Sequence, residues 1–270
     1  MADSNDAGGQ RDPRSVPDWE LPPGVPRAIW EYAHLPHIAR EYDDSIQHSG
    51  LARFDSRLLA EWFPRPGRLI DLGCGSGRHS VQFALRGFDV VAVDLSGEML
   101  KIVRERAESA GVSVETLHAN LCELDQVPDG TFDFAICMFA TLGMIAGPEA
   151  RLTMLRHVRR LLKPGGQFAL HVHNVWFNAF DPQGRRWLLK DRFRKLLGHA
   201  DAGDKRLHDR GVPHMYMHVF SRRELLRQLR EAGFTLETLV PLRPDGEGPL
   251  RFPHGLGSLR ANGWIVRVRA

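Results

Sequence analysis

Residues 68–80 read RLIDLGCGSGRHS, and the rest of the chain is organised around this stretch. A short apolar run ends at Asp71, and a segment of helical character begins near His79. Between them, glycines stand at alternate positions: Gly73, Gly75 and Gly77. This order predicts a buried strand, a tight loop and the start of a helix. Glycine suits such a loop because it accepts a positive φ and leaves no Cβ between the backbone and a ligand.

A second apolar run, residues 89–94 with the sequence DVVAVD, ends on Asp94. We expect this run to be the next parallel strand, so that Asp94 lies at the same edge of the sheet as the glycine loop. An ionised carboxylate only accepts hydrogen bonds, which makes Asp94 well suited to bind both hydroxyls of a ribose.

The loop spells D-x-G-x-G-x-G, which resembles the first motif of the class I S-adenosylmethionine (SAM) dependent methyltransferases. The resemblance extends over about residues 42–174. It implies an enzyme that uses SAM, releases S-adenosylhomocysteine and moves a methyl group to an acceptor. The alternative is a purely structural glycine turn.

Composition is ordinary for a globular protein, with 270 residues, 43% hydrophobic and 26% charged. No apolar run approaches the ~20 residues that span a bilayer. We therefore expect a cytoplasmic protein without a membrane partner. The cysteines Cys74, Cys122 and Cys137 are far apart, which favours a reducing compartment over a disulfide framework. A net charge of +3 allows nucleic-acid binding without implying it.

Alternating strand and helix patterns predict an α/β fold with a doubly wound, mostly parallel, seven-stranded sheet. The expected strands are residues 68–71, 89–94, 114–118, 132–137, 167–173, 235–240 and 264–268, the last of them antiparallel.

We expect a single methyltransferase domain over residues 28–270. It begins with a helical cap, residues 28–66, and it carries an insertion after the fifth strand, residues 174–218. The proline-rich residues 1–27 are expected to form a disordered tail.

The methyltransferase resemblance implies a set of cofactor contacts. Asp71 would hold the SAM ammonium group, Asp94 the ribose, and Asn120 the adenine, although the family usually has aspartate at the position of Asn120. The remaining expected contacts are Tyr42, Gly73, Cys74, Gly75, Gly77, Leu95, Met99, Leu121 and Met138. Structural readings remain open: Asp71 ordering the glycine turn, Asn120 capping a turn, and Tyr42, Leu95 and Met99 packing in the cap or core.

The fifth strand is expected to end in His171-Val172-His173-Asn174. His173 is the candidate general base, because the pKa of histidine lies near neutrality. A packed histidine is the alternative. The H-x-H pattern lacks a companion cluster of acids or cysteines, so no metal is expected.

The acceptor is expected to be a small molecule, with Asn174, Tyr216 and His218 as candidate substrate contacts. The chain lacks the N/D-P-P-Y motif of many base methyltransferases. Residues 215–220 (MYMHVF), Glu224-Leu225 and Gly263-Trp264 resemble the wobble-uridine tRNA methyltransferases, so tRNA is the alternative acceptor. A SAM-binding protein without catalysis is the third possibility. Oligomeric state stays open.

Residues 186–197, within the insertion, have the pattern of a short amphipathic helix. Its apolar side is expected to comprise Leu189, Phe193, Leu196 and Leu197, and its charged side Lys190 and Arg194.

Overall fold

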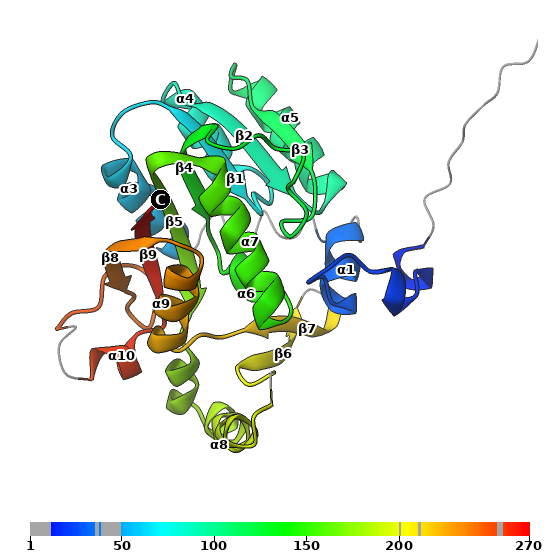
Figure 1. The fold of residues 1–270 in the computed structure, drawn as a ribbon, viewed down its shortest axis with the longest axis vertical. Coiled ribbons are helices and arrows are strands. Elements are labelled where there is room, and N and C mark those ends of the chain that lie inside the picture. The colour runs from blue at the N-terminus through cyan, green and yellow to red at the C-terminus, as the bar shows by residue number, and fades with distance from the viewer. Residues whose placement is uncertain (1–11, 36–37, 39–49, 200, 210–211, 253–255) are drawn as a thin grey trace, which may run out of the picture.

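The structure is a computed structural model that describes residues 12–35, 38, 50–199, 201–209, 212–252 and 256–270. Within these ranges, seven strands form one sheet in the order β3-β2-β1-β4-β5-β9-β8. Neighbouring strands are parallel from β3 to β5, and only β9 runs antiparallel to its neighbours β5 and β8. The predicted doubly wound, mostly parallel sheet is confirmed (Figure 1).

The strands of this sheet are β1 (Arg68–Leu72), β2 (Asp89–Asp94), β3 (Glu115–His118), β4 (Phe132–Cys137), β5 (Leu162–His173), β8 (Thr235–Pro241) and β9 (Gly263–Arg269). The helices are α1 (Arg27–His34), α3 (Gly50–Trp62), α4 (Arg78–Leu85), α5 (Gly97–Ser109), α6 (Thr141–Met144), α7 (Pro148–Leu161), α8 (Pro182–Leu196), α9 (Arg222–Glu231) and α10 (Gly257–Arg260). The strands β6 (Asp204–Asp209) and β7 (Val212–His218) form a separate two-stranded sheet.

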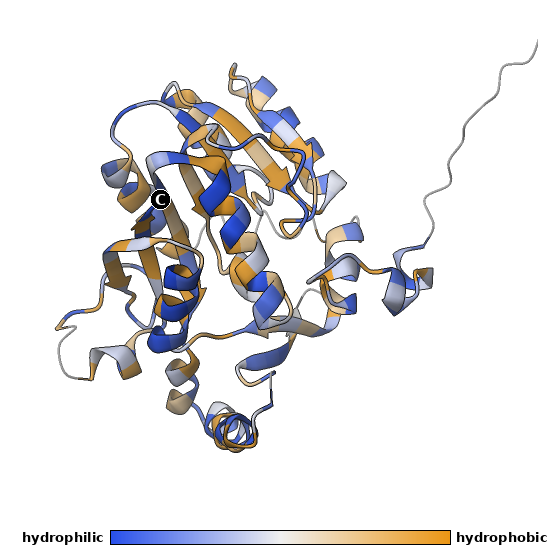
Figure 2. Ribbon diagram, in the orientation of Figure 1, coloured by the Kyte–Doolittle hydropathy of each residue, from blue (hydrophilic) through white to orange (hydrophobic). Residues whose placement is uncertain are grey.

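Helices cover both faces of the sheet, because its central strands are apolar on both sides. On one face, Leu155 of α7 and Leu225 of α9 share a core with Ile70 and Val172. On the other face, a separate core packs helices α3 and α4 against the sheet. Figure 2 shows the result, with hydrophobic central strands and polar residues on the outer sides of the helices.

Helix ends follow the local sequence. Ser96 caps α5 by accepting a hydrogen bond from the Met99 N–H at 3.4 Å, and Ser221 caps α9 in the same way. Both caps set the first turn of a helix immediately after a chain segment that reaches the carboxyl edge of the sheet. No helix of the described residues has the length and apolar character needed to cross a bilayer.

Residues 12–26, expected to belong to a disordered tail, are folded onto the domain. Two 3-10 turns, Pro13–Ser15 and Asp18–Glu20, precede α1. The Arg27 side chain fixes these turns by donating to the Pro13 carbonyl at 3.2 Å and to the Asp18 carboxylate at 2.8 Å. A polar segment needs no core of its own when such hydrogen bonds tie it to a helix that is already packed.

The chain between β5 and α9 leaves the main sheet, as expected for the insertion. It contains the 3-10 helix η3 (Val175–Phe180), α8 and the β6–β7 hairpin. Helix α8 starts earlier than predicted, at Pro182, because Asp181 caps it by accepting from the Gly184 N–H at 2.6 Å. In Figure 1 this insertion forms the lower end of the molecule, below α9.

Candidate active site

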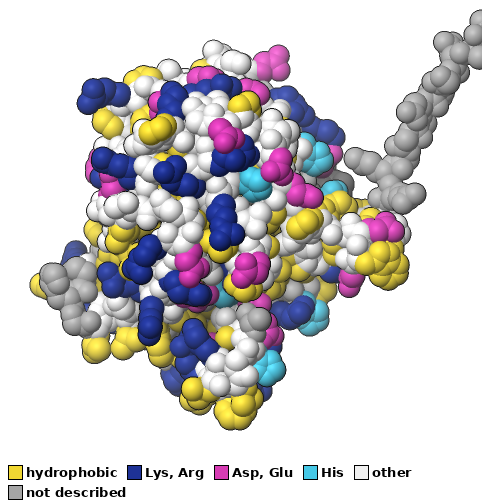
Figure 3. All heavy atoms as spheres, in the orientation of Figure 1, with side chains coloured by type: hydrophobic (Ala, Val, Ile, Leu, Met, Phe, Trp, Pro, Cys, Tyr) yellow, Lys and Arg dark blue, Asp and Glu magenta, His cyan; other side chains and the backbone are white. Residues whose placement is uncertain are grey.

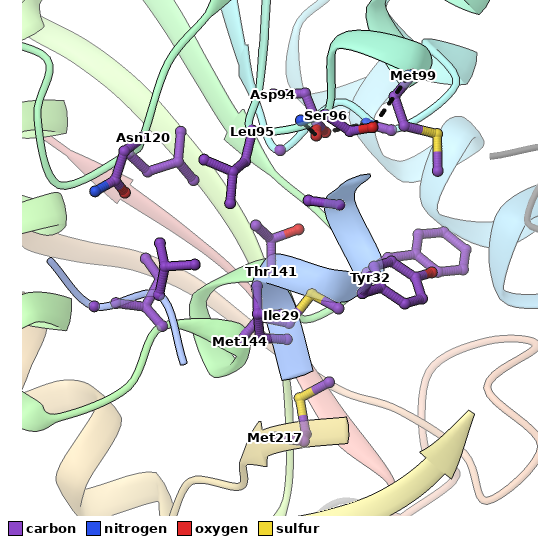
Figure 4. Close-up of a pocket in the computed structure, with 18 residues that line it drawn as sticks. Ile29, Tyr32, Asp94, Leu95, Ser96, Met99, Asn120, Thr141, Met144 and Met217 are labelled. Atoms are coloured by element: carbon purple, nitrogen blue, oxygen red, sulfur yellow. Dashed lines mark hydrogen bonds between the residues drawn. The ribbon is translucent and has the colours of Figure 1, made fainter. Parts of the chain in front are cut away.

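A cavity of about 420 Å³ lies at the carboxyl edge of the parallel strands (Figure 4). Of the residues expected to bind cofactor, its wall includes Gly73, Gly75, Asp94, Leu95, Met99, Asn120 and Leu121. The other residues of the wall, none of them among the expected contacts named above, are Gly24, Val25, Ile29, Tyr32, Ala33, Ser96, Phe139, Thr141, Met144, Ile145 and Met217. The cavity therefore joins the edge of the sheet to the N-terminal segment and to β7.

The glycine loop turns sharply out of β1 and is fixed by backbone hydrogen bonds. The N–H groups of Gly73 and Cys74 both donate to the Val93 carbonyl, at 2.8 and 3.0 Å. Gly73 has φ +70°, and a Cβ at this position would lie 2.4 Å from Thr141 Cγ2. Glycine is thus required here both by the left-handed backbone and by the close approach of α6.

Asp94 is held from both sides at the tip of β2. Its Oδ2 accepts from the Gly75 N–H at 2.8 Å, and its Oδ1 accepts from the Ser96 N–H at 2.8 Å. Burial raises the pKa of this carboxyl group, while the two backbone N–H groups oppose the rise. A carboxylate has about four acceptor positions, so Asp94 retains acceptor capacity toward the cavity for two hydroxyls.

Asp71 lies behind the loop, outside the cavity wall that the structure describes. It is 2% exposed, and its Oδ2 accepts from the Ser80 hydroxyl at 2.6 Å. Burial raises the pKa of Asp71, against the opposing charge of His79. These contacts correspond to the structural alternative, in which Asp71 orders the start of the loop and α4.

Three other expected cofactor contacts also lie behind the wall: Cys74, Gly77 and Met138. Gly77 begins α4 with φ +78°, and a Cβ there would meet Val103 Cγ2 at 2.7 Å. Its requirement for glycine comes from the packing of α4 against α5. Tyr42 lies outside the described residues.

Asn120 contacts the N-terminal segment through its side chain. Its Nδ2 donates to the Pro23 carbonyl at 2.9 Å and to Glu123 Oε2 at 3.0 Å, while its Oδ1 accepts from the Cys122 N–H at 3.1 Å. An aspartate has no N–H to donate and would repel Glu123. The contacts therefore explain why this chain departs from the aspartate that is usual at this position.

Residues 24–33 cover the cavity from the N-terminal side. Gly24 fits closely, because a Cβ on it would lie 2.9 Å from Ile145 Cγ2, and its carbonyl accepts from the Ala146 N–H at 2.8 Å. In Figure 4, Ile29 and Tyr32 of α1 lie opposite Thr141 and Met144. No local motif marks these positions. Tyr32 lines the cavity, whereas the tyrosine that the family resemblance implied, Tyr42, lies outside the described residues.

The loop after β4 carries local strain beside the cavity. Phe139 and Ala140 have φ values of +52° and +62°, although neither is glycine. Such conformations cost about 1–3 kcal/mol each and persist only where neighbours hold them. One neighbour is Arg78, whose guanidinium lies 5.1 Å from the Phe139 ring centroid and pairs with the Asp55 carboxylate at 2.9 Å. Phe139 lines the cavity, whereas the preceding residue Met138, the expected contact, does not.

The expected base His173 lies at the end of β5 but not in the described wall of this cavity. Burial lowers the pKa of His173, and the charge of Lys205 lowers it further. The ring centroids of His171 and His173 are 5.2 Å apart, and burial lowers the pKa of His171 to about 3. The described residues contain no group of three or more His, Cys, Asp or Glu placed to hold a metal.

Asn174, Tyr216 and His218, the candidate substrate contacts, lie outside the described wall of this cavity, and each is buried and already hydrogen-bonded. Asn174 Nδ2 donates to the carbonyls of Ser258 and Ala261, both at 2.8 Å. Two carboxylates hold the His218 ring, with Nδ1 2.7 Å from Asp204 Oδ1 and Nε2 2.9 Å from Glu224 Oε1.

Tyr216 belongs to the same buried network. Its hydroxyl lies 3.4 Å from Arg151 Nη1, and burial together with the charge of Asp204 raises its pKa well above the ordinary tyrosine value. Tyr216 and His218 thus connect β7 to α7 and α9.

Comparison with known proteins identifies the fold and the cofactor. The sequence profile of a family described as "Methyltransferase domain" matches residues 69–166, which contain the glycine loop and Asp94. A ubiquinone biosynthesis O-methyltransferase of Aromatoleum aromaticum is 27% identical over 90% of this chain and 96% of its own length. A putative methyltransferase of Bacillus subtilis is 29% identical over 51% of this chain, which spans 54% of that relative.

Some relatives match over less of their length. A ubiquinone biosynthesis O-methyltransferase of Xanthomonas axonopodis is 34% identical over 43% of this chain and 47% of its own. The chain thus spans about half the length of several curated relatives that it matches.

Solved structures share the fold. A SAM-dependent methyltransferase of Methanosarcina mazei superposes with a TM-score of 0.63 at 23% identity, covering 78% of this chain and 96% of that one. A Burkholderia thailandensis 1,6-didemethyltoxoflavin-N1-methyltransferase, solved with S-adenosylhomocysteine, gives 0.56 at 20% identity, covering 87% and 89%. SAM is the cofactor that this fold and family use. With its D-x-G-x-G-x-G loop, the acid at the end of β2 and its seven-stranded sheet, the chain belongs to the class I SAM-dependent methyltransferase superfamily.

Proposed function

We propose that this chain transfers the methyl group of SAM to a small, largely apolar molecule inside the cavity. The observation that carries the proposal is the composition of the cavity wall. Asp94 is the only charged side chain among the described residues that form it, and most of the others are apolar. A pocket of this kind selects by shape and apolar contact.

SAM and acceptor would occupy different ends of the cavity. Asp94 and Ser96 lie at one end in Figure 4, and Met217 lies at the other, with Thr141 and Met144 between them. The ribose of SAM would bind at Asp94, and the acceptor would lie toward Tyr32 and Met217. A covered site excludes water and aligns the acceptor atom in line with the methyl group, which supplies much of the acceleration.

Relatives support a small acceptor by their names. Both the ubiquinone biosynthesis enzymes and the toxoflavin-precursor enzyme are named for small-molecule methylation. The residues on which the tRNA resemblance rested, such as His218 and Trp264, are buried, and the cavity wall offers no described Lys or Arg for phosphate.

The test supplies SAM labelled in its methyl group together with either a low-mass extract or bulk tRNA. We expect the label to appear in the low-mass fraction only. Met217→Trp, which fills the acceptor end, should reduce transfer at least about ten-fold while the Kd for SAM stays within about two-fold. Labelling of tRNA, or SAM binding without transfer to either fraction, would contradict the proposal.

A further inference from the structure

Helix α8 presents a hydrophobic stripe to solvent. The stripe comprises Leu189, Phe193 and Leu196 of the helix and its C-cap residue Leu197, exposed by 73%, 64%, 86% and 62%. Their spacing of four, seven and eight residues places them on one side of the helix. The side that packs on the protein carries Gly184, Leu188 and Asp191 instead. The four residues of the predicted apolar side do share one side of the helix, but this side points away from the core. The helix as a whole has little amphipathic character, because cations lie around it.

Basic residues border the stripe. Helix α8 contains Arg185, Arg186, Lys190, Arg192, Arg194 and Lys195, and its only acid, Asp191, is buried and accepts from the Gly203 N–H. At 100° per residue, Arg186 lies within the stripe and Lys190 at its margin. Among the described residues, neither of these two cations has a carboxylate partner. The exposed side of α8 is therefore hydrophobic and positively charged, although Arg192 and Arg194 pair with Asp191 and Asp201.

The surface continues beyond α8. Phe180 of η3 is 60% exposed at the start of α8, and Leu256 beside α10 is 67% exposed. Asn174 joins the two elements, because it caps η3 and donates to the Ser258 carbonyl of α10. In Figure 3, hydrophobic side chains gather along this lower end of the molecule, next to Lys and Arg side chains. We call residues 180–197 with α10 the apolar-basic end.

Chemistry distinguishes the possible partners of this end. A second copy would place six cations of its own α8 against six identical ones, which opposes self-association. The phosphates of RNA attract the cations, but RNA offers no apolar environment in which the four exposed apolar side chains could be buried. An anionic lipid surface accepts both, because apolar side chains enter the interface while Lys and Arg contact phosphate groups.

We propose that the apolar-basic end docks on an anionic phospholipid surface, with α8 lying in the plane of the interface. This revises the expectation that the protein has no membrane partner, and it requires no helix that crosses the bilayer. On the buried side of α8, Leu188 packs with Val175 and Val219, and Met217 packs against the same cluster. Because Met217 also lines the cavity, the docked helix and the cavity wall share one layer of side chains. The proposal does not depend on the identity of the acceptor.

The test measures binding of the full chain to vesicles by cosedimentation, using phosphatidylcholine alone and phosphatidylcholine with phosphatidylglycerol. We expect binding to the mixed vesicles only, weakened by salt. The double variant Leu189→Gln/Leu196→Gln should lower the partition coefficient at least about ten-fold. Leu85→Gln, at a leucine 59% exposed on α4, is the control and should leave binding unchanged.

A second double variant tests the role of the cations. Arg186→Glu/Lys190→Glu should lower binding about 30-fold or more, since each lost cation is worth about five-fold and the acids add repulsion. Arg57→Glu/Arg65→Glu, exposed on another part of the surface, is the matched control. Three results would overturn the proposal: equal loss in the controls, absence of binding to anionic vesicles, or a solution dimer that Leu189→Gln/Leu196→Gln dissociates.

Discussion

The two sides of the cavity are held by different kinds of contact. On the sheet side, backbone hydrogen bonds of the glycine loop and of Asp94 fix the wall, and all the groups come from adjacent strands. On the covering side, Gly24 and Tyr32 reach the cavity through packing and through single contacts to residues more than a hundred positions away, such as the bond from the Ala146 N–H to the Gly24 carbonyl. The difference teaches that the wall around Asp94 is preformed by the topology of the sheet, whereas the covering side depends on a few long-range contacts.

The strongest way to separate the two sides is to remove the acid on the sheet side. Asp94→Ala loses the acceptor for the ribose and also releases the N–H groups of Gly75 and Ser96. Hydrogen bonds to a charged group contribute about 1.5–3 kcal/mol each, so the Kd for SAM should rise at least about 100-fold by calorimetry. Asp89→Ala, at the exposed start of the same strand, should leave the Kd unchanged. Retained affinity in Asp94→Ala would contradict the assignment of the ribose site.

The glycine loop gives the next largest effect. Gly73→Ala should lower the free energy of unfolding by about 3 kcal/mol or more, because a left-handed alanine costs about 1–2 kcal/mol and its Cβ overlaps Thr141. Gly111→Ala is a matched control, since Gly111 has φ +66° with nothing within 4 Å of a Cβ. It should lose only the backbone contribution in urea denaturation. Equal losses in both variants would show that α6 does not constrain the loop.

The cover is tested at Asn120. Asn120→Asp removes the donation to Pro23 and sets two carboxylates against each other, which should cost about 1–3 kcal/mol. We expect proteolysis to cut residues 12–26 faster and the Kd for SAM to rise about ten-fold. Asn262→Asp breaks a similar bond, from Asn262 Nδ2 to the Pro244 carbonyl at 3.2 Å, and serves as the control. If both variants bind SAM equally, the cover does not contribute to donor binding.

The smallest effect is the pH dependence of donor binding. Burial raises the pKa of Asp94, so this carboxyl takes up a proton at a higher pH than an ordinary aspartate with a pKa of 3.8. The Kd for SAM should therefore rise as pH falls through the raised pKa. The stability of the unliganded protein changes in the opposite sense. The contribution of Asp94 is complete below pH 3.8 and is lost as pH rises through its raised pKa. Asp94→Asn should bind SAM weakly with this pH dependence removed, as measured by titration calorimetry across pH.

Sequence reasoning predicted what local patterns encode. The strand–glycine–helix order predicted the sheet and the loop, and the acid at the end of the next apolar run predicted the position of Asp94. These predictions hold because the carboxyl ends of neighbouring parallel strands lie at the same edge of a sheet. It could not predict Gly24 or Met217, whose place in the wall results from tertiary packing. It also could not predict that two carboxylates, Asp204 and Glu224, enclose the His218 ring, since tertiary packing brings them together.

The contact between Asn120 and Pro23 has a consequence for the order of events in catalysis. The same short segment bonds to Asn120 of the cavity wall and to Ala146, the neighbour of the wall residue Ile145. We therefore expect SAM to enter before residues 23–25 close over the cavity, and S-adenosylhomocysteine to leave only after they open. We expect an ordered kinetic scheme in which the donor binds first, and in which opening of residues 23–25 sets the pace of turnover.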